Sequence, residues 1–130
     1  MSIINEVYDC LKKENRRRKG GYTRRSTRQE DLINNILSDK FFKTCRVFGF
    51  TPDELRASKR ARPLVKARQA FMYACKKECK YVAWMDLGRY LNLNHATIIH
   101  GYENVSNAVE SNEKYGAEQE YVDLINRLLE

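Results

Sequence analysis

The sequence predicts an all-α protein: a small helical domain built around a helix-turn-helix, with extra amino- and carboxy-terminal helices. First, apolar residues recur at spacings of three and four through most of the chain, the period of an amphipathic helix. Second, residues 87–100 hold the end of one helical pattern and the start of another, with a break too short for a loop. Third, Thr51 and Asn94 stand where helices should begin and can cap them with their side chains.

The composition fits one small domain with a short appendage. A length of 130 residues suits a single domain, and a hydrophobic content of 42% can build its core. No apolar run approaches the roughly 18 residues of a membrane span, and no signal-peptide pattern opens the chain. The cysteines at positions 10, 45, 75 and 79 lack C-x-x-C spacing and fit buried thiols in a reducing compartment. We therefore expect a cytoplasmic protein with no membrane association.

Positive charge is concentrated in the first part of the chain. The net charge is +7, but residues 103–130 carry seven acids against Lys114 and Arg127, which leaves +12 for residues 1–102. A basic body favours a polyanionic partner, because neutralising phosphates releases counterions. The alternative is a basic surface that is merely solvated.

Residues 1–28 are expected to form an appendage, and residues 29–130 the helical domain that carries the helix-turn-helix. An amphipathic helix is predicted from Ser2 to about Lys19, and Gly20-Gly21 ends it. The arginines that follow belong either to a flexible basic linker or to an arm that lies along phosphates or enters a minor groove.

Two helices are predicted next. The first spans Gln29 to Phe50, with its aromatic-rich tail, Phe42 to Phe50, packed inward. The second is short, Pro52 to Ser58, with Thr51 as its cap and proline in the first helical position.

A basic loop is predicted between this short helix and the next one. Six basic residues and no acid lie between Arg56 and Arg68. Pro63 is expected to bias Arg62 away from helix, so that the next helix spans Val65 to Lys80. The packing side of that helix is expected to hold Ala67, Phe71, Ala74 and Cys75, with Met72 and Tyr73 also mostly buried.

Residues 82–110 form the predicted helix-turn-helix, which we call the reading unit. A helix from Val82 to Leu91 precedes a recognition helix from Asn94 to about Glu110. Gly88 is expected where these helices approach closely. The second helix of a helix-turn-helix enters the DNA major groove by its amino-terminal end.

A last helix, Ala117 to Leu129, is predicted after a polar break at Ser111–Gly116. Its apolar stripe either caps the domain or serves a protein partner or a second copy of the chain. The stripe comprises Tyr121, Leu124, Ile125 and Leu128.

Three motifs carry a resemblance to a known family. They are Lys66-Ala-Arg-Gln-Ala-Phe-Met-Tyr, Asp86-Leu-Gly-Arg-Tyr-Leu and Asn94-His-Ala-Thr-Ile-Ile-His. In order and spacing they resemble the carboxy-terminal DNA-binding domain of the bacterial replication initiator DnaA, a Trp-repressor-like helix-turn-helix, over roughly Leu55 to Asn107. The family pattern has Asp where this chain has Asn94, and Thr where it has Ala96.

The resemblance implies double-stranded DNA as the partner. By position, the minor-groove role falls on Lys66, with Arg68 nearby, and the family's basic loop corresponds to Arg60 and Arg62. Major-groove contacts fall on the signature residues Asn94, His95, Ala96 and Thr97. The last three precede Ile98, the first position expected to be buried, so their side chains are predicted to point out of the domain. Ala96 lacks the hydroxyl of threonine but can touch a thymine methyl. His100, one turn further, is expected to reach phosphate.

Other chemistry is not indicated. The sequence has no G-x-x-x-x-G-K-[ST] loop, so the initiator's ATPase module is expected to be missing. The two histidines lie five residues apart with no further ligands at metal spacing, and no catalytic Ser/His/Asp or Cys/His arrangement occurs. We therefore expect no enzyme, no metal and no cofactor.

Two functional hypotheses remain open. The first is a DNA-binding protein of the initiator carboxy-terminal type that acts in replication or transcription control in a bacterial cell. The second is a phage-encoded or assembly protein with a structural or interaction role, which keeps the fold but does not read DNA sequence.

Overall fold

The computed structural model describes residues 27–57, 59–79 and 81–130, and these residues form six helices and no strand. The helices are α2 (Thr27–Phe48), α3 (Pro52–Arg56), α4 (Arg62–Glu78), α5 (Trp84–Leu91), α6 (His95–Tyr115) and α7 (Gln119–Leu129). The predicted all-α class is therefore confirmed. The predicted helix at Ser2–Lys19 lies outside the described residues, as does the basic arm except for Arg28, which belongs to α2.

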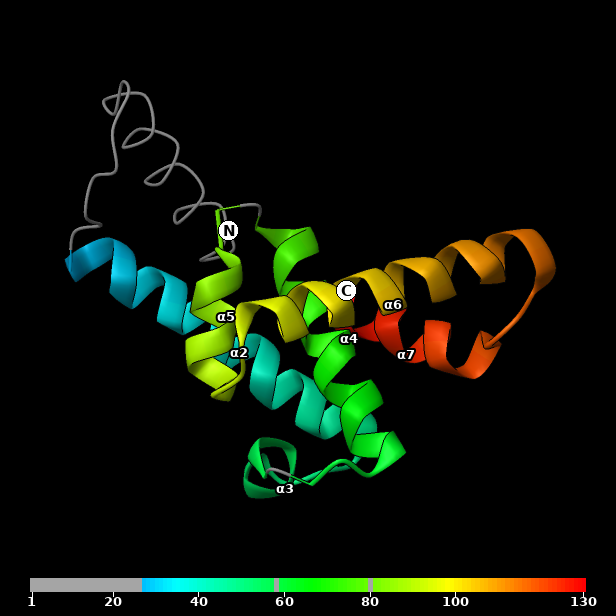
Figure 1. The fold of residues 1–130 in the computed structure, drawn as a ribbon, viewed down its shortest axis with the longest axis horizontal. Coiled ribbons are helices and arrows are strands. Elements are labelled where there is room, and N and C mark those ends of the chain that lie inside the picture. The colour runs from blue at the N-terminus through cyan, green and yellow to red at the C-terminus, as the bar shows by residue number, and fades with distance from the viewer. Residues whose placement is uncertain (1–26, 58, 80) are drawn as a thin grey trace.

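Helix α4 lies at the centre of the domain and packs against α2, α6 and α7 (Figure 1). The short helix α5 packs against α6 and α2, and α3 joins α2 to α4. In Figure 1, α7 folds back beneath the carboxy-terminal half of α6, at the end of the molecule opposite α5. No described helix is long and apolar enough to cross a membrane.

Two groups of buried side chains hold these helices together. The larger group joins α2, α4, α5 and the first turns of α6, and Phe41 packs edge-to-face on Phe71 with ring centroids 5.5 Å apart. The smaller group joins α4, α6 and α7 and includes Ile125 and Leu128, both fully buried. The apolar stripe of the last helix is thus used to cap the domain itself.

Buried lysine and cysteine side chains complete this interior. The Lys40 ammonium forms an ion pair with Glu78 and donates to the Leu128 carbonyl near the end of α7. Lys43 donates to the Glu130 carbonyl at 2.6 Å. Both lysines place positive charge where the helix dipole of α7 is negative. Cys75 is fully buried, and this burial raises the pKa of its thiol.

The structure corrects three sequence-based predictions. Helix α4 begins at Arg62 rather than Val65, because a proline in the first helical turn lacks only an N–H that has no partner in the helix. Helix α6 continues through the expected break at Ser111–Gly116 as far as Tyr115, where Gly116 adopts φ 68° and ends it. Phe42 does not pack inward, since half of its surface is exposed.

Two helix starts follow the prediction more closely. Thr51 caps α3 in a reciprocal capping box with Glu54, which holds the pKa of the Glu54 carboxyl below its usual value. The side-chain oxygen of Asn94 accepts the Ala96 N–H at 2.9 Å and caps α6.

Candidate nucleic-acid interface

Helices α5 and α6 are joined by the three residues Asn92, Leu93 and Asn94. Asn92 adopts the left-handed conformation with φ 55°, and the Leu93 N–H donates back to the Gly88 carbonyl at 2.8 Å. A Cβ atom on Gly88 would lie 2.7 Å from the Leu93 oxygen. The close approach predicted at Gly88 is therefore present, but its partner is the backbone of the turn rather than another helix.

A close approach between two helices occurs instead at Gly101, where α6 packs against α4. A Cβ atom there would lie 2.6 Å from the sulfur of Met72 on α4. Sequence reasoning missed this role, although Gly101 falls between the buried residues Ile98 and Val105 at spacings of three and four. That spacing is the signal that could have identified it.

The first turn of α6 presents its side chains to solvent. His95, Ala96 and Thr97 are all exposed, as predicted, and Ile98 is the first fully buried residue of the helix. His100 follows on the exposed side, with its Nδ1 3.9 Å from a Glu103 carboxylate oxygen. This turn therefore offers imidazole and hydroxyl groups at a helix amino terminus, where backbone N–H groups also favour negative charge.

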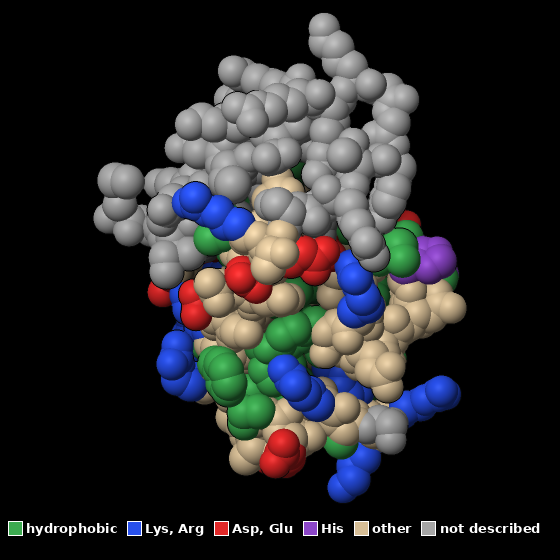
Figure 2. Space-filling view, turned by 90° about the vertical axis from the view of Figure 1, so that its left-hand side faces the viewer, with side chains coloured by type: hydrophobic (Ala, Val, Ile, Leu, Met, Phe, Trp, Pro, Cys, Tyr) green, Lys and Arg blue, Asp and Glu red, His purple; other side chains and the backbone are tan. Residues whose placement is uncertain are grey.

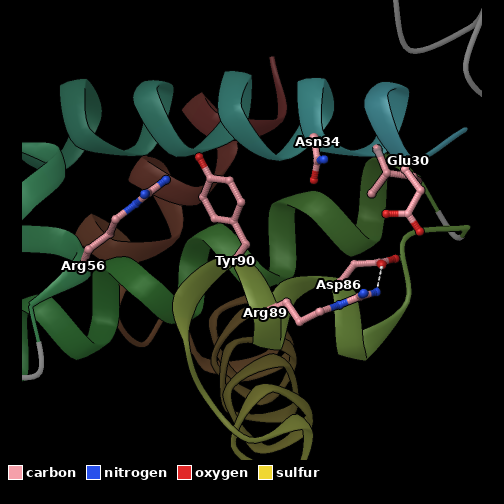
Figure 3. A pocket seen from close by; sticks show the side chains of 7 residues that line it. Glu30, Asn34, Arg56, Asp86, Arg89 and Tyr90 are labelled. Carbon is pink, nitrogen blue, oxygen red and sulfur yellow. Dashed lines mark hydrogen bonds and ion pairs between the residues drawn. The ribbon is translucent and has the colours of Figure 1, made fainter. Parts of the chain in front are cut away.

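A polar cavity of about 390 Å³ is lined by side chains of α2, α3 and α5 (Figure 3). Asp86 accepts the Ala83 N–H at 2.7 Å and pairs with Arg89 at 3.1 Å, which secures the start of α5. At the other end of the cavity the Arg56 guanidinium lies 4.6 Å from the centroid of the Tyr90 ring. Glu30 and Asp86 lie together at the opposite end, with Arg89 paired to Asp86, so both carboxylates and guanidinium groups line the cavity. This mixture of charges suits the support of α5 better than the binding of phosphate.

We call residues Lys59–Arg68 the basic segment. Arg68 uses three of its five N–H groups to hold carbonyl groups of the protein. Its Nε donates to Leu55 at 2.6 Å, one terminal nitrogen donates to Lys59 at 2.8 Å, and the other donates to Ala57. Burial lowers the pKa of Arg68, although a guanidinium stays protonated at neutral pH. Arg68 thus faces the protein and fixes the path of the chain from α3 to α4.

Lys66 also faces the protein, on the side of α7. Its ammonium lies 3.3 Å from a Glu118 carboxylate oxygen and 4.9 Å from the centroid of the Tyr121 ring. The Tyr121 hydroxyl donates to the Lys66 carbonyl at 2.8 Å. Burial is the main cause of the raised pKa of Tyr121.

The remaining basic side chains of the segment are open to solvent. Lys59, Arg60 and Arg62 are exposed, and none of the three side chains has a hydrogen bond or ion pair with another described residue. Basic side chains project from the lower part of the molecule in Figure 2, the region where α3 lies in Figure 1. Lys59 was not among the predicted site residues, although its place in the basic run is the same as that of Arg60.

A group of acidic residues lies at the far end of α6 and along α7. Glu110, Glu113, Glu120 and Asp123 are exposed there, away from the turn between α5 and α6 (Figure 1). Among the described residues, no group of three or more His, Cys, Asp or Glu side chains could hold a metal ion.

Comparisons with known proteins agree with this geometry. Residues 41–105 match the family described as the bacterial dnaA protein helix-turn-helix. A chromosomal replication initiator protein DnaA from Caldanaerobacter subterraneus subsp. tengcongensis is 26% identical over 89 residues. The match covers 65% of this chain but only 20% of that protein. No solved structure gives a significant match.

Proposed function

The chain belongs to the bacterial DnaA helix-turn-helix family, and from this membership we propose that it reads double-stranded DNA through the first turn of α6. The observation that carries the proposal is the exposed turn His95–Thr97, held in place by a capped helix start and a tight turn. The corresponding task is origin or operator binding in replication or transcription control, in the cytoplasm of a bacterial cell. This task would not use ATP bound by this sequence, which contains no G-x-x-x-x-G-K-[ST] loop.

In this proposal the amino-terminal end of α6 enters the major groove. His95 and Thr97 supply the hydrogen bonds to base edges, and Ala96 contacts a thymine methyl. The side-chain oxygen of Asn94 caps α6, and the side-chain N–H groups of the same amide remain available to contact DNA. His100, one turn along the exposed side, contacts a phosphate.

The basic segment supplies the contacts to the backbone and the minor groove. Arg60 and Arg62 are the first candidates, because they are exposed and unpaired among the described residues. Lys66 is a weaker contact, because Glu118 already neutralises its charge. Arg68 acts chiefly by holding the segment in shape, with two N–H groups left for a phosphate.

A second candidate function is a structural or interaction role in which DNA is held but not read, in a host or a phage assembly. The exposed Glu103 favours it, because this carboxylate lies beside His100 on the outer side of α6 and repels phosphate. Asn94 and Ala96 favour it too, since both depart from the family signature.

Selection of bound sequences from random duplexes tests the main proposal. A reader enriches a defined motif and binds it 10³-fold or more above random DNA, on the order of known specific binders. Affinity for the selected and the random duplex is then measured by fluorescence anisotropy over a salt series. A steep salt dependence with no enriched motif and equal affinities would favour the structural role instead.

A further inference from the structure

Lys66 and α7 are joined by contacts to both the side chain and the backbone of the lysine. The Lys66 ammonium contacts the Glu118 carboxylate and the Tyr121 ring, and the Tyr121 hydroxyl binds the Lys66 carbonyl. Glu118 and Tyr121 lie one turn apart at the start of α7. This start of α7 therefore covers the first turns of α4 on the side from which Lys66 projects.

The backbone of Glu118 provides an independent reason to single out this residue. Glu118 adopts the left-handed conformation, with φ 55°, which glycine reaches without strain and glutamate does not. It occupies the N-cap position of α7, yet its side chain makes no capping hydrogen bond there. A carboxylate at an N-cap normally accepts a backbone N–H of its own helix. At Glu118 the carboxylate reaches Lys66 instead.

The other end of α7 is fixed to the domain as well. Lys40 and Lys43 bind the carbonyl groups of Leu128 and Glu130, and the apolar side of the helix is buried. Glu118 is thus presented to Lys66 by a docked helix. A DNA phosphate that approaches Lys66 meets a carboxylate already in place.

We propose that Glu118 competes with DNA phosphate for the ammonium of Lys66, so that α7 acts as a built-in restraint on DNA affinity. The inference rests on the proposed function, since it needs Lys66 to lie near the DNA backbone. Two like charges cannot both pair closely with one ammonium at low cost, so binding of phosphate must displace the carboxylate.

The test compares Glu118→Gln with Glu120→Gln in the whole chain. Both changes remove one negative charge from the same end of α7, but Glu120 has no hydrogen bond or ion pair with a described residue. Affinity for a random-sequence duplex is measured by fluorescence anisotropy at low salt. Glu118→Gln should bind about two- to fivefold more tightly than Glu120→Gln, the range expected for release of an exposed ion pair.

Two further variants make the result specific. In a Lys66→Ala background, Glu118→Gln should give no more gain than Glu120→Gln, because the competed ammonium is gone. Glu118→Gly removes both the carboxylate and the backbone strain, so it should bind DNA more tightly while its melting temperature stays at or above that of the parent.

The outcomes separate the two proposals. Equal affinities of Glu118→Gln and Glu120→Gln, or a gain that persists without Lys66, overturn the competition while DNA binding by the parent chain stands. Failure of the parent chain to bind any duplex overturns the proposed function and the competition together.

Discussion

The first turn of α6 and the basic segment are both proposed to contact DNA, but the protein holds them in opposite ways. Main-chain features position the first turn of α6. Gly88 lets the preceding connection Asn92–Asn94 fold against α5, and Asn94 alone contributes a side chain to the cap. Side chains position the basic segment, through the three bonds of Arg68 and the pairing of Lys66 with Glu118.

This difference determines what a substitution can reveal. The His95 and Thr97 side chains are exposed and make no hydrogen bond or ion pair with another described residue, so their replacement should report chiefly on DNA contact. Replacement of Arg68 or Lys66 also removes contacts within the protein, so its effect on DNA binding has two possible sources. Position in a family motif therefore does not separate residues that touch the ligand from residues that shape the protein around it.

Gly88→Val should produce the largest effect, because it attacks the main-chain support of the α6 turn. The added Cβ would meet the Leu93 carbonyl, and a backbone atom in a three-residue turn cannot move aside cheaply. We expect a loss of about 3 kcal/mol in the free energy of unfolding, at the upper end of typical overpacking. Urea denaturation measures it, with the exposed position Asn107→Val as control. Equal stability of the two variants would show that the turn does not depend on this approach.

Arg68→Lys tests the side-chain support of the basic segment while it keeps the charge. A lysine ammonium cannot reach three carbonyls that a planar guanidinium holds together. We expect a loss of about 1.5–3 kcal/mol in the free energy of unfolding, the range for hydrogen bonds to a charged group. Arg62→Lys is the control and should leave stability unchanged. If both variants match the parent in stability and Arg68→Lys alone binds DNA less well, Arg68 is mainly a DNA contact.

His95→Ala and Thr97→Ala test whether the α6 turn reads bases. Each should weaken binding to the selected sequence by about 1–3 kcal/mol and leave binding to random DNA and the melting temperature nearly unchanged. Anisotropy with both duplexes and a thermal melt provide the measurements. Parallel losses on the two duplexes would mean that the turn contacts only phosphate.

Arg60→Ala and Arg62→Ala test the open part of the basic segment. Each should weaken binding to all duplexes alike and reduce the slope of log affinity against log salt by about 0.9, the value for one phosphate contact. Lys66→Ala should reduce the slope less, because the Lys66 ammonium is already paired with the Glu118 carboxylate. A larger change for Lys66→Ala than for both arginine variants would reverse the ranking within the segment.

A decrease of pH should slightly reduce the stability that the Glu54 capping box gives to α3, the helix before the basic segment. The capping box lowers the pKa of Glu54 in the folded state from its ordinary value of 4.5. Its contribution to stability is therefore complete above that value and is lost as the pH falls through the folded pKa. Melting temperatures between about pH 6 and pH 3 should converge for the parent and Glu54→Gln at the acidic end. A difference in melting temperature that stays constant over this pH range would show that ionisation of the Glu54 carboxyl does not stabilise the fold.

The sequence allowed the prediction of features set by neighbouring residues. The helical periods, the Thr51 and Asn94 caps, and the exposure of His95 to Thr97 all depend on spacings of a few residues. The predicted start of α4 and the predicted end of α6 were wrong. Helix ends depend on small differences in free energy, and a single proline or a polar stretch does not decide them.

The partners of the basic residues could not be predicted for a different reason. Lys66 and Glu118 are 52 positions apart, and Arg68 and Leu55 are 13 apart. No local pattern encodes such pairs, because they arise only when α7 and α3 dock on α4. Family position suggested a DNA role for Lys66 and Arg68, and the structure shows that both side chains also make contacts within the protein.

Trp84 provides an intrinsic fluorescence probe at the contact between α5 and α6. It is the only tryptophan of the chain and stands at the start of α5, edge-on to Tyr102 of α6 with centroids 5.3 Å apart. The Lys76 ammonium of α4 lies 4.5 Å from the centroid of its ring. Indole emission responds to nearby charge and packing, so its wavelength and intensity report any shift among α4, α5 and α6. Docking on DNA can therefore be followed in the unlabelled protein.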